Sequence, residues 1–372
     1  MASVSDTTES QSTLVIRAGL CIDGEAFDRF GRVLRRLLVG LVDQAVSVRL
    51  LSCDPHVETL TLGPVQTLVH KRVVWPVAGR RIDQLLDALS QKPPTVMHAV
   101  SSATYRVAGA LAEAFDTDLV FQVTSLKDCD AIGNFAGPRV GRFIAFSQPL
   151  ATVLEEQLKI PAERIDLVRP GVLASQRIAC FADPQRVPSI LCLSPLERGS
   201  GVDELIKAVD LLRKRDHTFM LFLLGTGPQE PALRRMIRGR KLFPCVTLAH
   251  PAGGVAQAFH SADIFVRPSV DSAFNDDGLL AMAAGMAVIT SPNSICDHFR
   301  NGETAVVCEK PKAELLAGAI GQLLSDKAGA RRLATTAVEY VRAHHPVSRM
   351  AERTAEGYRT LALARATFAL KE

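Results

Sequence analysis

The second half of the chain contains the stretch Phe219-Met220-Leu221-Phe222-Leu223-Leu224-Gly225-Thr226-Gly227-Pro228, which decides the class of fold. Six consecutive apolar residues that end in a turn of glycine and proline are typical of a buried strand. An amphipathic helix at Gln229–Arg238 and another apolar strand at Cys245–Leu248 follow. A strand, a helix and a strand at this spacing predict a parallel sheet covered by helices.

The same alternation extends in both directions from this stretch. The other expected strands are Thr13–Arg17, Val46–Leu51, Thr95–Val100, Leu119–Val123, Arg142–Phe146, Ile165–Val168, Ile190–Leu193, Ile264–Val266 and Ala287–Thr290. The other expected helices are Asp28–Val42, Thr104–Phe115, Pro149–Leu158, Val202–Lys214, Gly254–Ala262, Gly278–Ala284, Pro311–Leu324, Ala328–His344 and one from about Ser348 to Phe368. This pattern predicts an α/β fold with two doubly wound domains, whose ligand cleft faces the carboxyl ends of both sheets.

The length of 372 residues suggests two domains, each with its own core. We expect a disordered tail at 1–12, an N-terminal Rossmann-like domain at 13–180 and a C-terminal one at 185–345. The boundary falls near 174–187, which has no periodicity. The last segment, 346–372, is expected to be a helix that packs back on the first domain.

Composition excludes several classes of protein. A net charge of +4 and an aromatic content of 5% give neither the basic footprint nor the stacking platform of a nucleic-acid-binding protein. No apolar run reaches the roughly 18 residues that span a bilayer, and the N-terminus shows no signal peptide. The eight cysteines are scattered singly, so we expect reduced thiols in a cytosolic protein and neither a zinc site nor a cofactor.

Five ordered motifs in residues 185–345 resemble the nucleotide-sugar-binding domain of family-4 glycosyltransferases, which have the GT-B fold. They are Gly201-Val202-Asp203-Glu204-Leu205-Ile206-Lys207-Ala208, Leu224-Gly225-Thr226-Gly227-Pro228, Ser261-Ala262-Asp263-Ile264-Phe265-Val266-Arg267-Pro268-Ser269, Ala281-Met282-Ala283-Ala284-Gly285 and Arg300-Asn301-Gly302-Glu303-Thr304-Ala305. The first half is similar more loosely, at 96–101, 143–147 and 164–172. The resemblance implies a GT-B fold and transfer of a sugar from a nucleotide sugar.

The positions that carry catalysis in that family hold other residue types here. The family's diphosphate-clamping Arg and Lys fall at Pro195 and Ser200, and its two glutamates fall at Ser272 and Leu280. The family's histidine in the first domain falls at about Thr124. Leucine accepts no hydrogen bond, so Leu280 cannot hold the ribose hydroxyls as the family's glutamate does.

The family's glycine-rich phosphate turn reads Ala273-Phe274-Asn275-Asp276-Asp277 in this chain. We expect Asp276 and Asp277 to cap the following helix with their side chains and to repel a diphosphate. The remaining donor-binding candidates are Arg198, Gly225, Phe274, Asn275, Asp276 and Asp297. Arg198 reaches a phosphate of the donor only if its loop is shifted relative to that of the family. Asp297 stands where the family has another glutamate.

Two further features allow a functional and a plain interpretation. Asp271, Asp276 and Asp277 either hold a divalent cation or cap a helix and face solvent. The first helix carries Arg29, Arg32, Arg35 and Arg36, and Arg234, Arg235, Arg238, Arg240 and Lys241 form another basic cluster. Such a helix either docks on an anionic membrane, as in some family members, or presents a solvated face.

Two hypotheses follow for the function. The first is a retaining glycosyltransferase of the cytoplasm or the inner face of the membrane, with a glycan or lipid-linked acceptor. Arg198 and the amides around Phe274–Asn275 would then stabilise the diphosphate. The second is a non-catalytic relative that binds a sugar, a glycan or a protein partner through the cleft. An active enzyme with an unusual donor is a third option that no residue favours. A cation such as Arg198, Arg267 or Arg300 in the cleft would favour the first hypothesis, and an acidic and apolar cleft floor the second.

Overall fold

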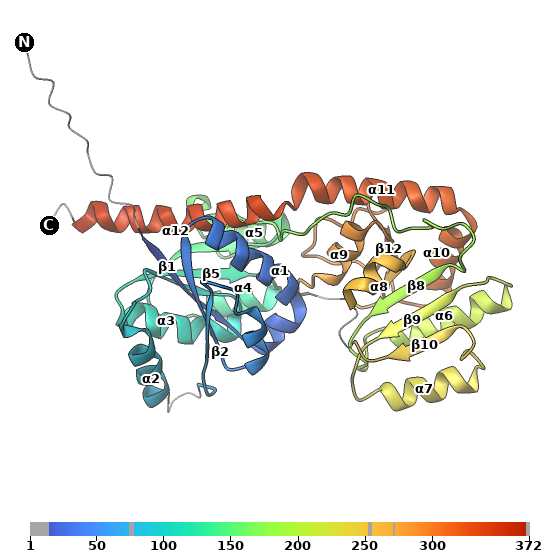
Figure 1. Cartoon of the computed structure of the whole chain (residues 1–372), viewed down its shortest axis with the longest axis horizontal. Coiled ribbons are helices and arrows are strands. Elements are labelled where there is room, and N and C mark those ends of the chain that lie inside the picture. The colour runs from blue at the N-terminus through green and yellow to red at the C-terminus, as the bar shows by residue number, and fades with distance from the viewer. Residues whose placement is uncertain (1–14, 74–77, 252–254, 271, 370–372) are drawn as a thin grey trace, which may run out of the picture.

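The computed structural model describes residues 15–73, 78–251, 255–270 and 272–369, and it has a parallel sheet in each half of the chain (Figure 1). In the described residues the first sheet has the strand order β3-β2-β1-β4-β5-β6-β7, and the second has the order β10-β9-β8-β11-β12-β13. The strand pairs within both sheets are parallel. The predicted α/β class with two doubly wound domains is confirmed.

The first sheet contains β1 (Ile16–Ile22), β2 (Val46–Ser52), β3 (Gln66–Val69), β4 (Val96–Ala99), β5 (Asp118–Val123), β6 (Val140–Ala145) and β7 (Ile165–Leu167). Its helices are α1 (Gly24–Asp43), α2 (Gly79–Ser90), α3 (Tyr105–Ala114), α4 (Leu126–Gly133) and α5 (Gln148–Thr152). The sequence pattern predicted neither the short strand β3 nor the helices α2 and α4. In β3 the side chains are half-buried or exposed, so it lacks the apolar pattern of a core strand.

The second sheet contains β8 (Ser189–Leu193), β9 (Met220–Leu224), β10 (Val246–Ala249), β11 (Ile264–Arg267), β12 (Ala287–Thr290) and β13 (Val306–Val307). Its helices are α6 (Val202–Lys214), α7 (Glu230–Gly239), α8 (Val255–Ser261), α9 (Asp277–Ala284), α10 (Ala313–Ser325) and α11 (Lys327–His344). The expected start of α8 at Gly254 and the expected tail at 1–12 lie outside the described residues. The expected first strand starts at Ile16 among the described residues and runs five residues beyond Arg17.

The last helix, α12 (Val347–Ala369), returns to the first domain and packs along α1 (Figure 1). The contact is close at Gly40 of α1, where an added Cβ would lie 2.5 Å from the Cβ of Ala351. Farther along α12, the buried Tyr358 hydroxyl lies 2.6 Å from Nδ1 of His98 in β4. The helix therefore joins the C-terminus of the chain to the core of the first sheet.

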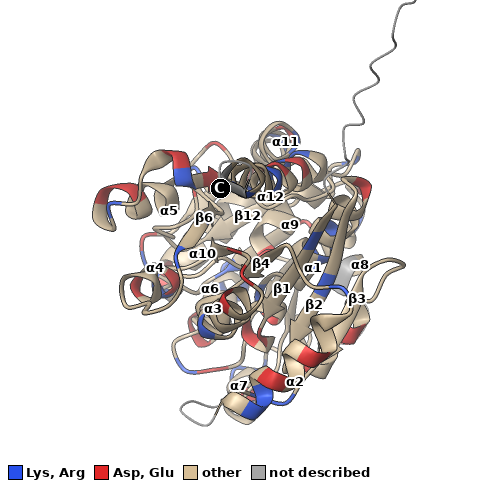
Figure 2. Cartoon of the chain, turned by 90° about the vertical axis from the view of Figure 1, so that its left-hand side faces the viewer, with Lys and Arg blue, Asp and Glu red and all other residues tan. Residues whose placement is uncertain are grey.

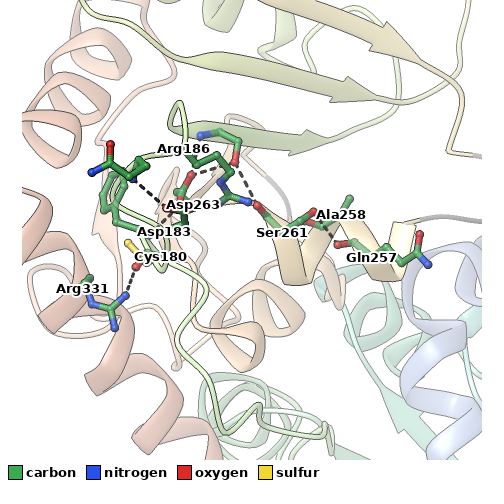
Figure 3. A network of polar contacts seen from close by, with 11 residues as sticks. Cys180, Asp183, Arg186, Gln257, Ala258, Ser261, Asp263 and Arg331 are labelled. Carbon is green, nitrogen blue, oxygen red and sulfur yellow. Dashed lines mark hydrogen bonds and ion pairs between the residues drawn. The ribbon is translucent and has the colours of Figure 1, made fainter.

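The segment between the two sheets is held by the aspartate of the Ala262-Asp263 motif. The Asp263 carboxylate accepts from the backbone N–H of Phe181 at 2.7 Å and of Ser189 at 2.7 Å. Arg186 donates to the same carboxylate at 3.0 Å, as does the Ser189 hydroxyl. Figure 3 shows this network beside Cys180, whose carbonyl accepts from Arg331. One buried carboxylate thus fixes both ends of the segment that leads into β8.

We expect Asp263→Ala to lower the free energy of unfolding by about 2–3 kcal/mol, because two buried N–H groups lose their acceptor. Urea unfolding followed by circular dichroism measures this change. The control is Asp183→Ala, which removes an exposed carboxylate from the same segment. Equal stabilities of the two variants would contradict the assigned role of Asp263.

All eight cysteines are free thiols, and five of them are buried. Burial raises the pKa of Cys21 and of Cys192 to about 12, so both stay protonated at neutral pH. These thiols pack as small apolar side chains.

Candidate functional site

The carboxyl ends of the two sheets meet at residues 124–126 and 272–274. The backbone N–H of Phe274 donates to the carbonyl of Thr124 at 2.7 Å, and that of Leu126 donates to the carbonyl of Ser272 at 3.1 Å. Ser125 and Ala273 form an isolated antiparallel bridge between these bonds. The loop after β5 and the segment before α9 are therefore in direct backbone contact.

The same segment is inserted into α1 through Asp276. The N–H of Asp276 donates to the Arg29 carbonyl at 3.0 Å, and the N–H of Val33 donates to the Asp276 carboxylate at 3.3 Å. In an unbroken helix these two groups of α1 bond to each other, since they are four residues apart. Phe30 between them has φ −148° and ψ 27°, so the helix is kinked there. Asp276 satisfies both halves of the broken bond, a recognised cause of helix kinks.

Arg32 of α1 forms ion pairs with the carboxylates of both Asp276 and Asp277. Burial raises the pKa of Asp276 to about 6, and the Arg32 guanidinium opposes this rise. Burial lowers the pKa of Arg32, but the two carboxylates outweigh it and the pKa is raised. Asp276 and Arg32 are therefore both mainly charged at neutral pH. The N-terminus of α9 is thus occupied by charges of the chain itself.

Apolar contacts complete the junction. The Phe274 ring lies 6.2 Å from that of Phe30 and 5.3 Å from that of Phe146, measured between centroids. The guanidinium of Arg32 also lies 5.8 Å from the centroid of Phe259. Buried rings and paired charges therefore fill this junction, and the cation that pairs with both carboxylates comes from α1.

The prediction that Asp276 and Asp277 cap the helix α9 with their side chains is wrong. Neither Asp276 nor Asp277 caps α9 with its side chain, because both carboxylates face Arg32. Instead the amide oxygen of Asn275 accepts from the Asp277 N–H at 2.8 Å. Tertiary pairing with a guanidinium is stronger than a local cap, so the neutral neighbour takes the capping position.

The basic face expected on the first helix is also corrected by the structure. The Arg29 side chain is only 17% exposed and donates to the Phe274 carbonyl, while Arg32 is paired as described. Arg36 is half-buried, and burial lowers its pKa. Only Arg35 is exposed, so α1 does not offer a surface of four arginines. On this side of the molecule Lys and Arg are mixed with Asp and Glu (Figure 2).

A second ion pair joins the halves of the chain at Asp297. Arg169 donates to the Asp297 carboxylate at 2.5 Å, and the N–H of Gln148 donates to it at 3.3 Å. Burial raises the pKa of Asp297, but the ion pair outweighs this and holds it below its ordinary value. The adjacent His298 is buried, and burial lowers its pKa to about 3. Asp297 therefore holds the two halves together, and His298 is a packed neutral side chain.

The other predicted site residues lie apart from this junction. Pro195 and Arg198 are exposed in the loop after β8, and the Ser200 hydroxyl donates to the Glu197 carbonyl at 2.9 Å. Arg198 lines a cavity of about 230 Å³ between this loop and α7, together with Asp203. This placement leaves Arg198 outside the contact between the two sheets.

Gly225, Leu280 and Thr124 have structural contacts. A Cβ on Gly225 would lie 2.0 Å from the carbonyl oxygen of Ser194, so only glycine lets the turn close on the loop after β8. Leu280 is buried in the core. Thr124 is buried, and its N–H and hydroxyl both donate to Asp128, at 2.9 and 3.0 Å. Ser272 is exposed, and its carbonyl forms the bridge already described.

The two other cations that we considered for the cleft have different positions. Arg267 is buried at the end of β11. Arg300 is exposed, pairs with Glu303 at 3.2 Å and lies over the ring of Tyr340. Arg267 therefore lies at the carboxyl end of a strand of the second sheet, whereas the ion pairs of Asp276 and Asp277 are formed by Arg32 of α1.

A cavity of about 150 Å³ opens beside the bridge. Its lining comes from the carboxyl ends of β1, β4 and β5 and from the segment before α9, and includes Asp23, Ser101, Ser102, Lys127, Asp128 and Ser272. Hydroxyl and carboxylate groups dominate this lining. Ser101 donates to Asp23, and the Ser102 N–H donates to Asp128 at 2.9 Å, so both carboxylates are held in place.

Sequence reasoning missed the role of Arg29 and Arg32. Their spacing, with Arg36, puts them on one face of α1, and this was the available signal. This spacing indicated a basic stripe but not the carboxylates that bind it, because Asp276 and Asp277 are more than 240 residues away in the sequence.

No group of three or more metal-ligating side chains is found within the described part of the chain. Asp271, one of the three aspartates considered for a cation, lies outside it. Within the described ranges no helix is long and apolar enough to cross a membrane.

Comparison with known proteins agrees with this architecture. Residues 187–326 match the family model for glycosyl transferases group 1. A glycogen synthase of Mycobacterium tuberculosis is 24% identical over 337 residues, which cover 85% of this chain and 81% of the relative. A glycosyltransferase from Rickettsia africae superposes with a TM-score of 0.76 at 15% identity, covering 93% of this chain and 98% of that one. HepE from Anabaena, in complex with UDP, superposes with a TM-score of 0.73 at 15% identity and coverages of 93% and 100%. The chain therefore has the fold of these glycosyltransferase structures, and its residues 187–326 are similar to the group 1 glycosyltransferases.

Proposed function

We propose that this chain is a non-catalytic member of its family that binds a carbohydrate in the cleft and transfers no sugar. The proposal rests on the backbone bridge between Thr124–Leu126 and Ser272–Phe274. In the resemblance drawn above, Thr124 and Ser272 stand where family members present a histidine and a glutamate to the donor sugar. Hydrogen bonds of 2.7 and 3.1 Å join these segments directly, so no sugar ring can lie between them.

Charge supports the same conclusion. A diphosphate at the N-terminus of α9 would meet the carboxylates of Asp276 and Asp277, which repel it. Arg32 already bonds to both carboxylates and is not free to replace the family's clamp. A diphosphate would have to displace these ion pairs before it gained any contact of its own.

The ligand class follows from the cavity beside the bridge. Its lining offers hydroxyl and carboxylate groups that can exchange hydrogen bonds with the hydroxyls of a sugar. It holds the carboxylates Asp23, Glu25 and Asp128 against the cations Arg29 and Lys127, so it does not favour an anion. A neutral saccharide end therefore fits this cavity better than a phosphate.

Calorimetric titration tests the proposal. We expect no micromolar binding of UDP-, GDP- or ADP-sugars, with or without magnesium, and measurable binding of a neutral oligosaccharide. Ser102→Ala should weaken saccharide binding, whereas Ser200→Ala, which lies outside the cavity, should not. Micromolar binding of a nucleotide sugar that Arg198→Gln abolishes would refute the proposal.

A second candidate is sugar transfer from a nucleotide donor with retention, to a glycan or lipid-linked acceptor. The family match and the relatives named glycogen synthase and mannosyltransferase favour it, and HepE was solved with UDP. Donor binding in the titration above, followed by release of the nucleoside diphosphate on addition of an acceptor, would establish this candidate in place of the first.

A further inference from the structure

We propose that the first domain binds a small oxyanion, phosphate or a phosphomonoester, in a cavity at the amino-terminal edge of its sheet. The cavity has a volume of about 220 Å³ and lies at the opposite end of the strands from the cleft. Its lining contains Arg17, Arg49 and Lys92 and no aspartate or glutamate. The proposal is independent of the function proposed for the cleft.

The register of the strands gathers these cations on one face of the sheet. Arg17 of β1 pairs with Ser47 of β2, and Arg49 of β2 pairs with Gly19 of β1. Side chains two residues apart on a strand share a face, so the two arginines point to the same side. Gly19 has no side chain, which leaves space opposite Arg49.

The C-terminal end of α2 and the loop that follows it line the cavity, and each positions one guanidinium group. Arg17 donates through Nε to the Pro93 carbonyl at 2.6 Å, and Arg49 donates through Nη1 to the Ala88 carbonyl at 3.2 Å. Each guanidinium has five N–H donors, so both keep donors for another acceptor. Lys92, two residues beyond α2, brings the third positive charge.

These cations have no counter-ion in the described part of the chain, where no carboxylate lies within 4.0 Å of their nitrogens. Both arginines are partly exposed and their bonds to the carbonyls lie at the surface, so an anion can reach the remaining donors. The carbonyls at the end of α2 supply only a partial negative charge. Ser47 and Gln66 in the lining add neutral donors. An oxyanion of two charges matches this set, because guanidinium groups bind phosphate oxygens with charge-assisted hydrogen bonds.

Calorimetric titration at low salt with inorganic phosphate and with glycerol 3-phosphate tests the proposal, and glycerol is the neutral control. We expect both phosphates to bind and glycerol not to bind. Arg49→Gln and Lys92→Gln should each weaken binding about tenfold, which corresponds to the loss of one charge-assisted contact. Arg81→Gln removes a half-buried arginine of α2 that does not line the cavity, so this variant should bind like the natural protein.

The comparison between the two phosphates separates a free anion from a phosphorylated molecule. Tighter binding of glycerol 3-phosphate would assign the site to phosphomonoesters, and tighter binding of phosphate to the free ion. Absence of binding at millimolar phosphate would overturn the proposal, as would an equal loss of binding in Arg81→Gln. Circular dichroism of each variant shows that it is folded. Lys92 is exposed, so its substitution tests the site even if the Arg49 variant fails to fold.

Discussion

Replacement of Asp276 by alanine is expected to lower the free energy of unfolding by about 3–5 kcal/mol, the range for removing one partner of a buried ion pair. The side chain is fully buried. Its loss leaves the Val33 N–H without an acceptor and removes one of the two carboxylates that compensate Arg32. The junction between α1 and α9 should open, because the kink in α1 exists only in combination with the inserted segment.

Two variants separate the contributions. Asp276→Asn keeps an oxygen acceptor for Val33 and loses the charge, so it should be intermediate in stability. Asp277→Ala leaves Arg32 paired with Asp276 and leaves α1 in contact, so we expect a loss of about 1–2 kcal/mol. Urea unfolding gives these differences, and small-angle scattering reports whether the two halves separate. An Asp276→Ala protein within 1 kcal/mol of the natural one would show that the insertion does not hold the domains together.

Acidification from pH 6.5 to 4 is expected to destabilise the protein steeply. His98, His298 and His345 are buried, and burial lowers their pKa values to about 3, 3 and 4. In the unfolded chain histidine has a pKa of about 6.5. Between these values the unfolded chain binds more protons than the folded one, so stability falls as the pH falls.

Asp276 acts in the opposite direction over part of this range. Its folded pKa of about 6 lies above the ordinary 3.8, so the folded chain binds a proton first as the pH falls from 6 to 4. The proton that Asp276 binds in the folded chain thus offsets one of the three protons that the histidines bind in the unfolded chain. About two protons remain, which corresponds to roughly 3 kcal/mol per pH unit in the middle of the range.

Urea unfolding at pH 7.5, 6 and 5 measures this dependence. His98→Gln should reduce the slope by about one proton, since it removes one titrating group. The glutamine can still bond to the Tyr358 hydroxyl, which lies 2.6 Å from the histidine ring. A stability that is constant from pH 7 to 5 would contradict the assignment of neutral buried histidines.

Local pattern was sufficient to predict the buried strands of both sheets, but it missed β3 and β13, which have no buried residue. The apolar run at 219–224 and the glycine turn after it are a strand and a close approach to Ser194 in the structure. The buried positions of a strand or helix recur with the period of that element, so the pattern of apolar residues can be recognised in a short stretch of sequence. Helices α2 and α4 were missed because they contribute few buried residues, such as Leu85 and Leu89 of α2.

The positions of the candidate site could be identified from the sequence, but not their contacts. Asp276 and Asp277 were expected to cap a helix because a sequence shows only near neighbours. In the structure Arg32 takes both carboxylates and Asn275 takes the cap. A charge pair between distant segments depends on how two domains meet, and no local preference encodes it.

By itself the sequence determined two parallel sheets and a glycine turn after the second strand of the second sheet, and the placement of the family's clamp at Pro195 and Ser200 stays a prediction. Those features follow from residue type, apolar periodicity and the conformational freedom of glycine. Only the tertiary structure decided that the segment at 272–277 binds α1 and the loop after β5, that Asp297 joins Arg169, and that Arg17 and Arg49 share a cavity. These contacts arise where strand register and domain packing bring distant polar groups together, and there hydrogen bonding and charge pairing select the arrangement.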